Sequence, residues 1–183
     1  TTFAAMDPVV LITFIGASTL LFLTPGADMM FAIASGMSGG PKVGLAAAAG
    51  IALGGLFHGV MAAIGLAALV AAIPYAFDGI KYAGAVYLAW LAWKTWTASG
   101  EIVLQEGKPD LFRAFRRGFV INVLNPKVAL FVLAFLPQFT DPAVGPIWQQ
   151  MLILGIILSL GALFFKSIYG GFAGVLSTSV RRH

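Results

Sequence analysis

Two long apolar segments of this chain are each interrupted by a proline beside an ionisable residue. The first interruption is Thr-Pro-Gly-Ala-Asp at residues 24–28, and the second is Asn-Pro-Lys at residues 125–127. A backbone inside lipid must satisfy its own hydrogen bonds, so irregular segments at membrane depth are tolerated only inside protein or beside a cavity. The pattern therefore predicts a helical membrane protein in which two broken helices form an internal site.

The composition agrees with burial in lipid. Of the 183 residues, 60% are hydrophobic and 10% are charged, whereas soluble domains carry about 25% charged residues. A helix needs about 20 apolar residues to cross a bilayer. The expected fold is an all-α polytopic protein of the lipid bilayer. Its five expected helices cover approximately residues 8–34, 42–73, 75–97, 112–137 and 147–176.

Most lysine and arginine residues near the helix ends lie at alternate ends. They occur between the first two helices, in and around the segment 98–111, and in the C-terminal tail, with Lys81 as the exception on the other side. The positive-inside rule then places residues 98–111 in the cytoplasm and the N-terminus outside. Although the net charge is +4, no basic stripe with interleaved aromatic residues occurs, so we expect no nucleic-acid partner.

The two halves of the chain show an internal repeat. Pro25 and Pro126 break corresponding helices, and the Gly-Pro pairs at residues 40–41 and 145–146 open the next ones. We divide the chain into a first three-helix repeat at 1–97, a cytoplasmic connecting loop at 98–111, and an inverted, incomplete second repeat at 112–183. A partner for the third helix would fall near residues 180–202, so we expect a 3+3 design whose sixth helix is missing or truncated. Five native helices are the alternative.

In the first half, Thr24, Pro25, Gly26 and Asp28 are the predicted pathway residues. Proline removes a helical hydrogen bond and glycine relaxes the backbone, which should create a new helix N-terminus near Asp28. A carboxylate is stabilised there by the helix dipole. Because a charge at mid-membrane costs about 2.5–3.5 kcal/mol on insertion scales, we interpret Asp28 as functional. A cap at a helix restart is the alternative, and both roles can coexist.

In the second half, the corresponding residues are Asn122, Asn125, Pro126 and Lys127. Lys127 follows Arg117 by ten residues, about 15 Å along a helix, which makes simple snorkelling to the interface a poor explanation. Asn122 and Asn125 would orient a solute through amide hydrogen bonds. For Asn122 alone, an interhelical hydrogen bond is the alternative.

We expect Asp28 and Lys127 to pair, because pairing reduces the cost of burying both charges. The pair would act either as a gate or as the recognition site for a zwitterion, with Asp28 on its ammonium and Lys127 on its carboxylate. His58 is a candidate proton relay, with an interhelical hydrogen bond as the alternative. Lys166 is expected to snorkel to the inner surface.

The sequence lacks the motifs of common enzyme classes. It has no cysteine and no phosphate-binding, zinc-protease or serine-hydrolase motif. We therefore expect no enzyme activity, no catalytic residue, no metal site and no cofactor.

The chain resembles the LysE/RhtB family of bacterial amino-acid exporters. The matching stretches occur in family order and cover most of residues 10–140; they are residues 24–29, 39–59, 81–88, 117–127 and 135–139. The resemblance implies a six-helix exporter of the bacterial inner membrane with a 3+3 repeat, driven by the proton motive force. It also implies threonine, homoserine, lysine or related solutes as cargo. The resemblance departs at the C-terminus, where we expect the family's last helix to be missing or truncated.

The leading hypothesis is therefore a secondary active exporter of small amino acids or analogues, with Asp28 carrying the coupled proton. The alternative is a non-transporting, exporter-like membrane subunit of a larger complex. A homo-oligomer or a membrane complex is the expected kind of protein partner. A membrane-embedded enzyme is a third hypothesis, which lacks a nucleophile or metal cluster to support it.

Overall fold

The computed structural model describes residues 6–73, 76–96 and 110–180. Within these ranges the chain is helical and has no β-strand. The helices are α2 (Pro8–Leu23), α3 (Ala27–Gly39), α4 (Pro41–Ala72), α5 (Ala76–Trp96), α6 (Leu111–Val123), α7 (Pro126–Phe135), the 3₁₀ turn η1 (Leu136–Phe139) and α8 (Ile147–Val180). The expected all-α fold is confirmed.

Two helices, α4 and α8, are long and apolar enough to cross a membrane by themselves. The pairs α2–α3 and α6–α7 meet the same criterion together, and they bend by 58° and 61° at their breaks. The described residues thus supply two candidate spans, or four if each bent pair is one span. The helix expected at 75–97 exists as α5 but falls outside this criterion, so its crossing remains a prediction.

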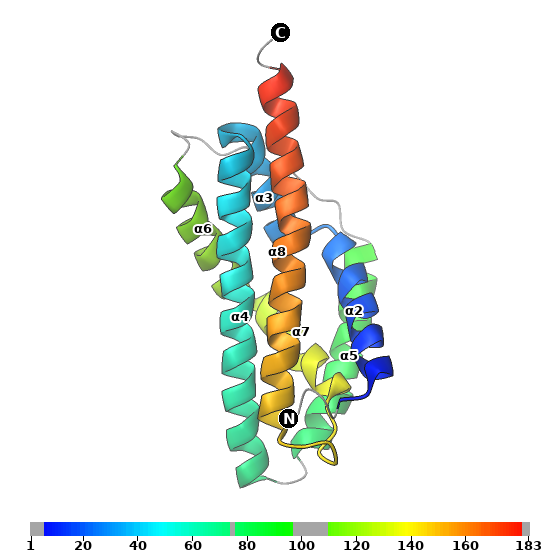
Figure 1. Cartoon of the computed structure of the whole chain (residues 1–183). Helices are drawn as coiled ribbons and strands as arrows, with labels where there is room; N and C mark the ends of the chain where they lie inside the picture. The colour runs from blue at the N-terminus through cyan, green and yellow to red at the C-terminus, as the bar shows by residue number, and fades with distance from the viewer. Residues whose placement is uncertain (1–5, 74–75, 97–109, 181–183) are drawn as a thin grey trace.

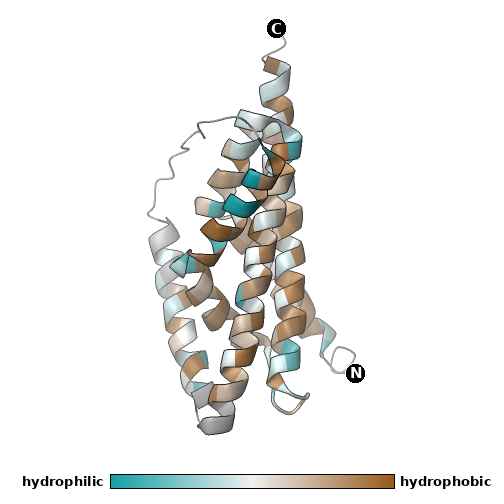
Figure 2. Cartoon of the chain, turned by 90° about the vertical axis from the view of Figure 1, so that its left-hand side faces the viewer, coloured by the Kyte–Doolittle hydropathy of each residue, from teal (hydrophilic) through white to brown (hydrophobic). Residues whose placement is uncertain are grey.

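The longest helices, α4 and α8, run side by side through the centre of the molecule (Figure 1). Helix α6 packs on α4, α3 packs on both long helices, and α5 lies beside α7. Apolar residues dominate the ribbons, and hydrophilic residues are confined to short stretches (Figure 2). Large side chains such as Leu20, Tyr82 and Phe172 are exposed at the periphery, which suits contact with lipid chains.

Small residues allow the central helices to approach closely. A methyl group on Gly36 of α3 or on Gly44 of α4 would overlap the carbonyl oxygen of Gly170 on α8, and one on Gly174 would overlap the main chain at Pro41. Backbones that touch in this way gain dispersion contacts that larger side chains would prevent. The α3–α4–α8 contact is therefore a tightly packed scaffold.

The contact between α4 and α6 is equally close. A methyl group on Gly50 would overlap the carbonyl oxygen of Phe115, and one on Gly118 would lie 2.5 Å from that of Ala47. These glycines place the middle of α6, ahead of the second break, directly against α4.

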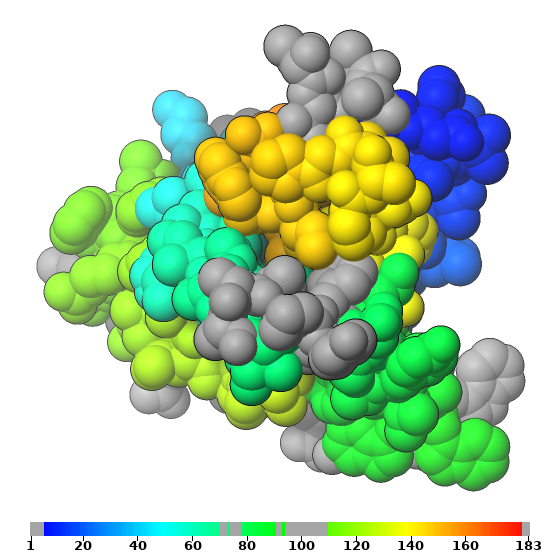
Figure 3. Space-filling view, turned by 90° about the horizontal axis from the view of Figure 1, so that it is seen from below, coloured from blue at the N-terminus to red at the C-terminus, as the bar shows by residue number. Residues whose placement is uncertain are grey.

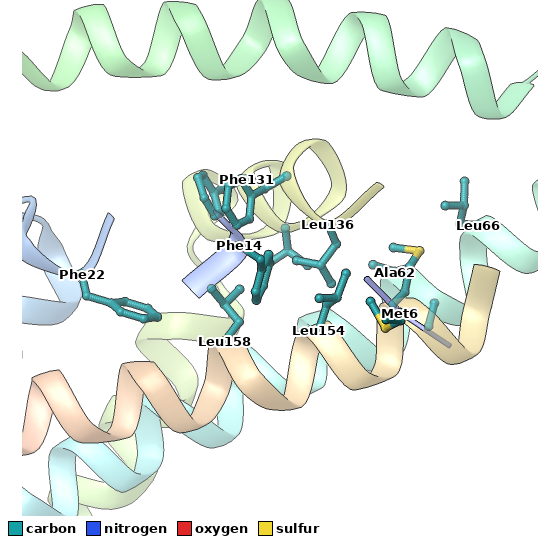
Figure 4. Packing of buried hydrophobic residues seen from close by; sticks show 13 residues of the cluster. Met6, Phe14, Phe22, Ala62, Leu66, Phe131, Leu136, Leu154 and Leu158 are labelled. Atoms are coloured by element: carbon teal, nitrogen blue, oxygen red, sulfur yellow. The ribbon is translucent and has the colours of Figure 1, made fainter. Parts of the chain in front are cut away.

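An aromatic and aliphatic core joins α2, α7, η1 and α8 (Figure 4). The Phe14 ring lies 5.3 Å from that of Phe135 and 5.1 Å from that of Phe139, measured between centroids. Leu154 of α8 is fully buried in the same cluster. This core fixes α2 and α7, the helices beside the two breaks, against the long helix α8.

Gly-Pro corners open the two long helices in matching ways. Gly40 (φ 83°) and Gly145 (φ 151°) are the described residues with positive φ, a region that favours glycine. At the second corner, Gln150 donates to the carbonyl oxygens of Asp141 and Gly145 at 2.8 and 2.9 Å. This loop and the start of α8 lie beside α2 at one end of the molecule (Figure 3).

Two expectations are not tested. The connecting segment at 98–111 lies almost entirely outside the described residues, and so does the end of the chain, where a sixth helix was expected to begin. The bends and glycine corners match locally, and the inverted relation of the two halves remains a prediction.

Candidate functional site

The first break separates α2 from α3. Thr24 is extended (φ −75°, ψ 125°), its hydroxyl donates to the Leu20 carbonyl oxygen at 2.9 Å, and Gly26 precedes α3 in an extended conformation. Gly26 offers no side-chain cap to α3, and Asp28 lies in its first turn. The Asp28 carboxylate is therefore at the positive end of a helix dipole.

The second break separates α6 from α7. Asn125 is the N-cap of α7, and its side-chain oxygen accepts a hydrogen bond from the Lys127 N–H at 3.0 Å. Pro126 occupies the first turn of α7, where its missing N–H is not needed. The second break is thus capped by its own side chain, whereas the first is not.

Side chains from the two breaks meet. The Asn122 amide donates to Asp28 Oδ2 at 2.8 Å, which joins the end of α6 to the start of α3. A methyl group on Gly26 would lie 3.9 Å from Lys127 Nζ, so the ammonium of the second break sits beside the first. Residues far apart in sequence form one cluster.

A third charged side chain, Lys166 of α8, belongs to this cluster. Lys166 is only 7% exposed, so the expected snorkelling to the membrane surface was wrong. It is the strongest electrostatic partner of Asp28, and Lys127 is a weaker one. The Lys166 ammonium also lies 5.6 Å from the centre of the Tyr169 ring, within the range of a cation–π interaction. Asp28, Lys127 and Lys166 therefore form a cluster of three ionisable side chains, and direct pairing of Asp28 with Lys127 remains a prediction.

A sequence signal for Lys166 did exist. Gly170 and Gly174 follow it by four and eight residues, and Gly155 precedes it by eleven. These spacings share one helix face, and all three glycines are buried. A lysine on the small-residue face of a helix points to the protein interior rather than to lipid.

The cluster lines a partly open cavity of about 110 Å³. A water molecule occupies about 30 Å³ in the liquid, so the cavity suits a solute of a few heavy atoms. The polar side chains of its lining are Thr24, Asp28, Asn122, Asn125, Lys127, Ser159 and Lys166, and the rest of the lining includes Gly26, Leu21, Phe22, Ile51, Phe131, Val132 and Leu158. Six of the predicted pathway residues line it, whereas Pro25 and Pro126 shape the breaks without lining it.

Two buried acceptor atoms in this lining have no hydrogen bond of normal geometry among the described residues, although the Asn125 side chain also interacts with the Asp28 carboxylate. They are Asp28 Oδ1 and Asn122 Oδ1. The Asn122 amide nitrogen donates one N–H to Asp28 Oδ2, and the two unsatisfied oxygens both accept hydrogen bonds. A buried acceptor left unsatisfied costs about 1–3 kcal/mol. A solute with several N–H donors would relieve this cost.

His58 of α4 lies behind the cavity rather than in it. Its Nε2 is 3.1 Å from the main-chain oxygen of Asn122, which also accepts from the Asn125 N–H at 3.1 Å. The interhelical hydrogen bond considered for His58 is therefore present, and its role as a proton relay remains a prediction. In the described ranges no three His, Cys, Asp or Glu side chains are grouped to hold a metal ion.

Comparison with known proteins adds independent information. A family model described as LysE type translocator matches residues 19–183. The "Homoserine/homoserine lactone efflux protein" of Salmonella typhimurium is 36% identical over 141 residues, covering 76% of this chain and 68% of that protein. The "Leucine efflux protein" of Enterobacter sp. (strain 638) is 29% identical over 162 residues, covering 85% of this chain and 75% of that protein.

A membrane protein of Vibrio cholerae serotype O1 without a functional name is 35% identical over 153 residues, covering 82% of this chain and 74% of that protein. No solved structure gave a significant match.

Proposed function

This chain belongs to the LysE type translocator family, and we propose that it is a secondary active exporter of small amino acids or their analogues. Threonine, homoserine and lysine are the proposed candidate cargoes, and leucine is a fourth candidate because the Enterobacter relative is named a leucine efflux protein. The observation that carries the proposal is one carboxylate and two ammonium groups around a small cavity where two broken helices meet.

An α-amino acid is complementary to this lining. Its ammonium has three N–H donors, and Asp28 Oδ1 and Asn122 Oδ1 are buried acceptors without a hydrogen bond of normal geometry among the described residues. Its carboxylate would bind at Lys127, where the N-termini of α3 and α7 add positive potential. Transporters use half-helix N-termini for anionic substrate groups in the same way. The cavity thus offers a place for each charge of a zwitterion.

The coupling is proposed to involve Asp28. Within the described residues it is the acidic side chain of the lining, and intramembrane carboxylates carry protons in many pumps and transporters. We propose the bacterial inner membrane as the location, with the N-terminus outside, and rocking of two inverted halves about the cavity as the transport movement. Cargo would bind between the halves, since the two breaks supply opposite parts of the lining.

The experiment is efflux from proteoliposomes loaded with labelled threonine, homoserine, lysine or leucine, with and without an inward proton gradient. Asp28→Asn should abolish gradient-driven efflux, because the amide cannot exchange a proton. Asp78→Asn is the matched control, since Asp78 is exposed in the first turn of α5. Equal gradient-driven efflux by wild type and Asp28→Asn would refute the coupling, and absence of flux for every solute would refute the exporter.

A further inference from the structure

The charges that line the cavity are unequal in number. Lys127 and Lys166 face a single carboxylate, Asp28, and the described lining contains no other ionisable side chain. An unpaired charge in a poorly solvated site is costly unless a counter-charge is supplied. The site therefore has one basic side chain more than its own carboxylate can pair.

Both lysines are held where they are. Lys166 is buried on α8, and its ammonium lies over the Tyr169 ring. The Tyr169 hydroxyl donates to the Phe22 carbonyl oxygen at 3.4 Å, beside the first break. The Asn125 cap holds the Lys127 main chain in the first turn of α7, and the half-buried Lys127 side chain reaches toward Gly26 at the first break.

From this arrangement we propose that Lys127 and Lys166 form a two-cation subsite that requires a free carboxylate on the cargo. The two oxygens of a carboxylate can accept from two ammonium groups, one on each lysine, while the cargo's own ammonium occupies the Asp28–Asn122 side. The inference rests on the proposed function and narrows its substrate class to small amino acids with an intact carboxylate and an uncharged side chain.

The same numbers of basic and acidic side chains predict weak binding for two groups of amino-acid analogues. A lactone, ester or amide of an amino acid is a cation that brings no anion to the lysines. Lysine itself brings a second ammonium, for which the described lining has no second carboxylate. We expect homoserine to bind about 10- to 100-fold more tightly than homoserine lactone, the ratio expected from one hydrogen bond between charged groups. Threonine should bind more tightly than threonine methyl ester, and more tightly than lysine, by a similar factor.

The test measures binding and flux separately. Thermal stabilisation of the purified protein is titrated with homoserine, homoserine lactone, threonine, threonine methyl ester and lysine, and efflux of the same solutes is measured from proteoliposomes. Lys166→Gln should reduce the homoserine-to-lactone ratio to near one, and Lys166→Arg should retain it. Lys42→Gln is the control, because Lys42 is exposed at the start of α4.

The outcomes separate this inference from the proposed function. Carboxylate-dependent binding that depends on Lys166 but comes without flux would overturn the exporter and support the subsite. Flux of homoserine and its lactone at equal efficiency would support the exporter and overturn the subsite. If Lys166→Gln does not fold, the ratio in the wild-type protein decides alone, and a ratio near one overturns the inference.

Discussion

The contact between Gly54 and Asn122 gives a direct test of how the site is built. A methyl group on Gly54 would lie 2.7 Å from Asn122 Cβ and 2.7 Å from Asn122 Oδ1, too close for real atoms. The Asn122 side chain cannot move aside freely, because it is 3% exposed and its amide is hydrogen-bonded to Asp28. Gly54→Ala must therefore either displace the end of α6 or break the Asn122–Asp28 hydrogen bond.

The magnitude follows from two terms. Overpacking a filled site costs about 1–3 kcal/mol, and loss of a hydrogen bond to a charged group costs about 1.5–3 kcal/mol. Because the displaced amide can find new partners in the polar cavity, we expect a loss of stability of about 2–4 kcal/mol, below the sum of these two terms. The rate of efflux should also fall, because the Asn122–Asp28 contact that shapes the cargo site is lost.

The assay compares Gly54→Ala with Gly65→Ala by thermal denaturation in detergent and by efflux. Gly65 lies on the same helix, is exposed, and has no atom within 4 Å of an added methyl group. A double variant with Asn122→Ala should be less destabilised than the sum of the single variants, since the hydrogen bond is lost once. If Gly54→Ala is as stable and as active as Gly65→Ala, the proposed positioning of Asn122 by α4 is refuted.

Three further predictions use the same assays. Gly36→Ala should destabilise the protein by more than about 2 kcal/mol, because its methyl group overlaps the carbonyl oxygen of Gly170; a melting temperature within 1 °C of wild type (roughly 0.3 kcal/mol) would contradict this. Gly40→Ala should cost about 1–2 kcal/mol from its positive φ, measured by denaturation, although its methyl group has room beside α8. His58→Leu should cost about 0.5–1.5 kcal/mol and slow efflux, because the Asn122 carbonyl loses a donor; unchanged efflux would remove His58 from the pathway.

Much of the fold could be predicted because lipid restricts the backbone so strongly. Pro25 and Pro126 marked the breaks because proline inside a helix removes a hydrogen bond that lipid cannot replace. The same reasoning identified Asp28 and Lys127, since ionisable groups at membrane depth need a structural or functional reason. These inferences use only local chemistry and the bilayer, and the long helices α4 and α8 follow from apolar length alone.

Lys166 is not marked by a helix break, so its place beside Asp28 depends on tertiary packing. A lysine within a long apolar helix can reach the surface, pair inside the protein, or line a cavity, and the glycine spacing on its face argues against the surface without deciding between the other two. The face of α8 that meets α3 and α4 decides between them, and that face is set by the glycine contacts. The same limit left His58 with two interpretations, until its distance to the Asn122 carbonyl oxygen was seen.

The residues of the site lie on two kinds of element, the unbroken helix α8 and the half-helices that follow the two breaks. Lys166 and Ser159 lie on the unbroken helix α8, where Ser159 donates to the Ala52 carbonyl oxygen of α4 at 2.7 Å. Asp28 and Lys127 lie instead in the first turns of the half-helices α3 and α7. Cargo held by both lysines would therefore link α8 to α7 through its carboxylate and to α3 through its ammonium. A solute lacking either group could not make that link, so selectivity and movement would depend on the same contacts.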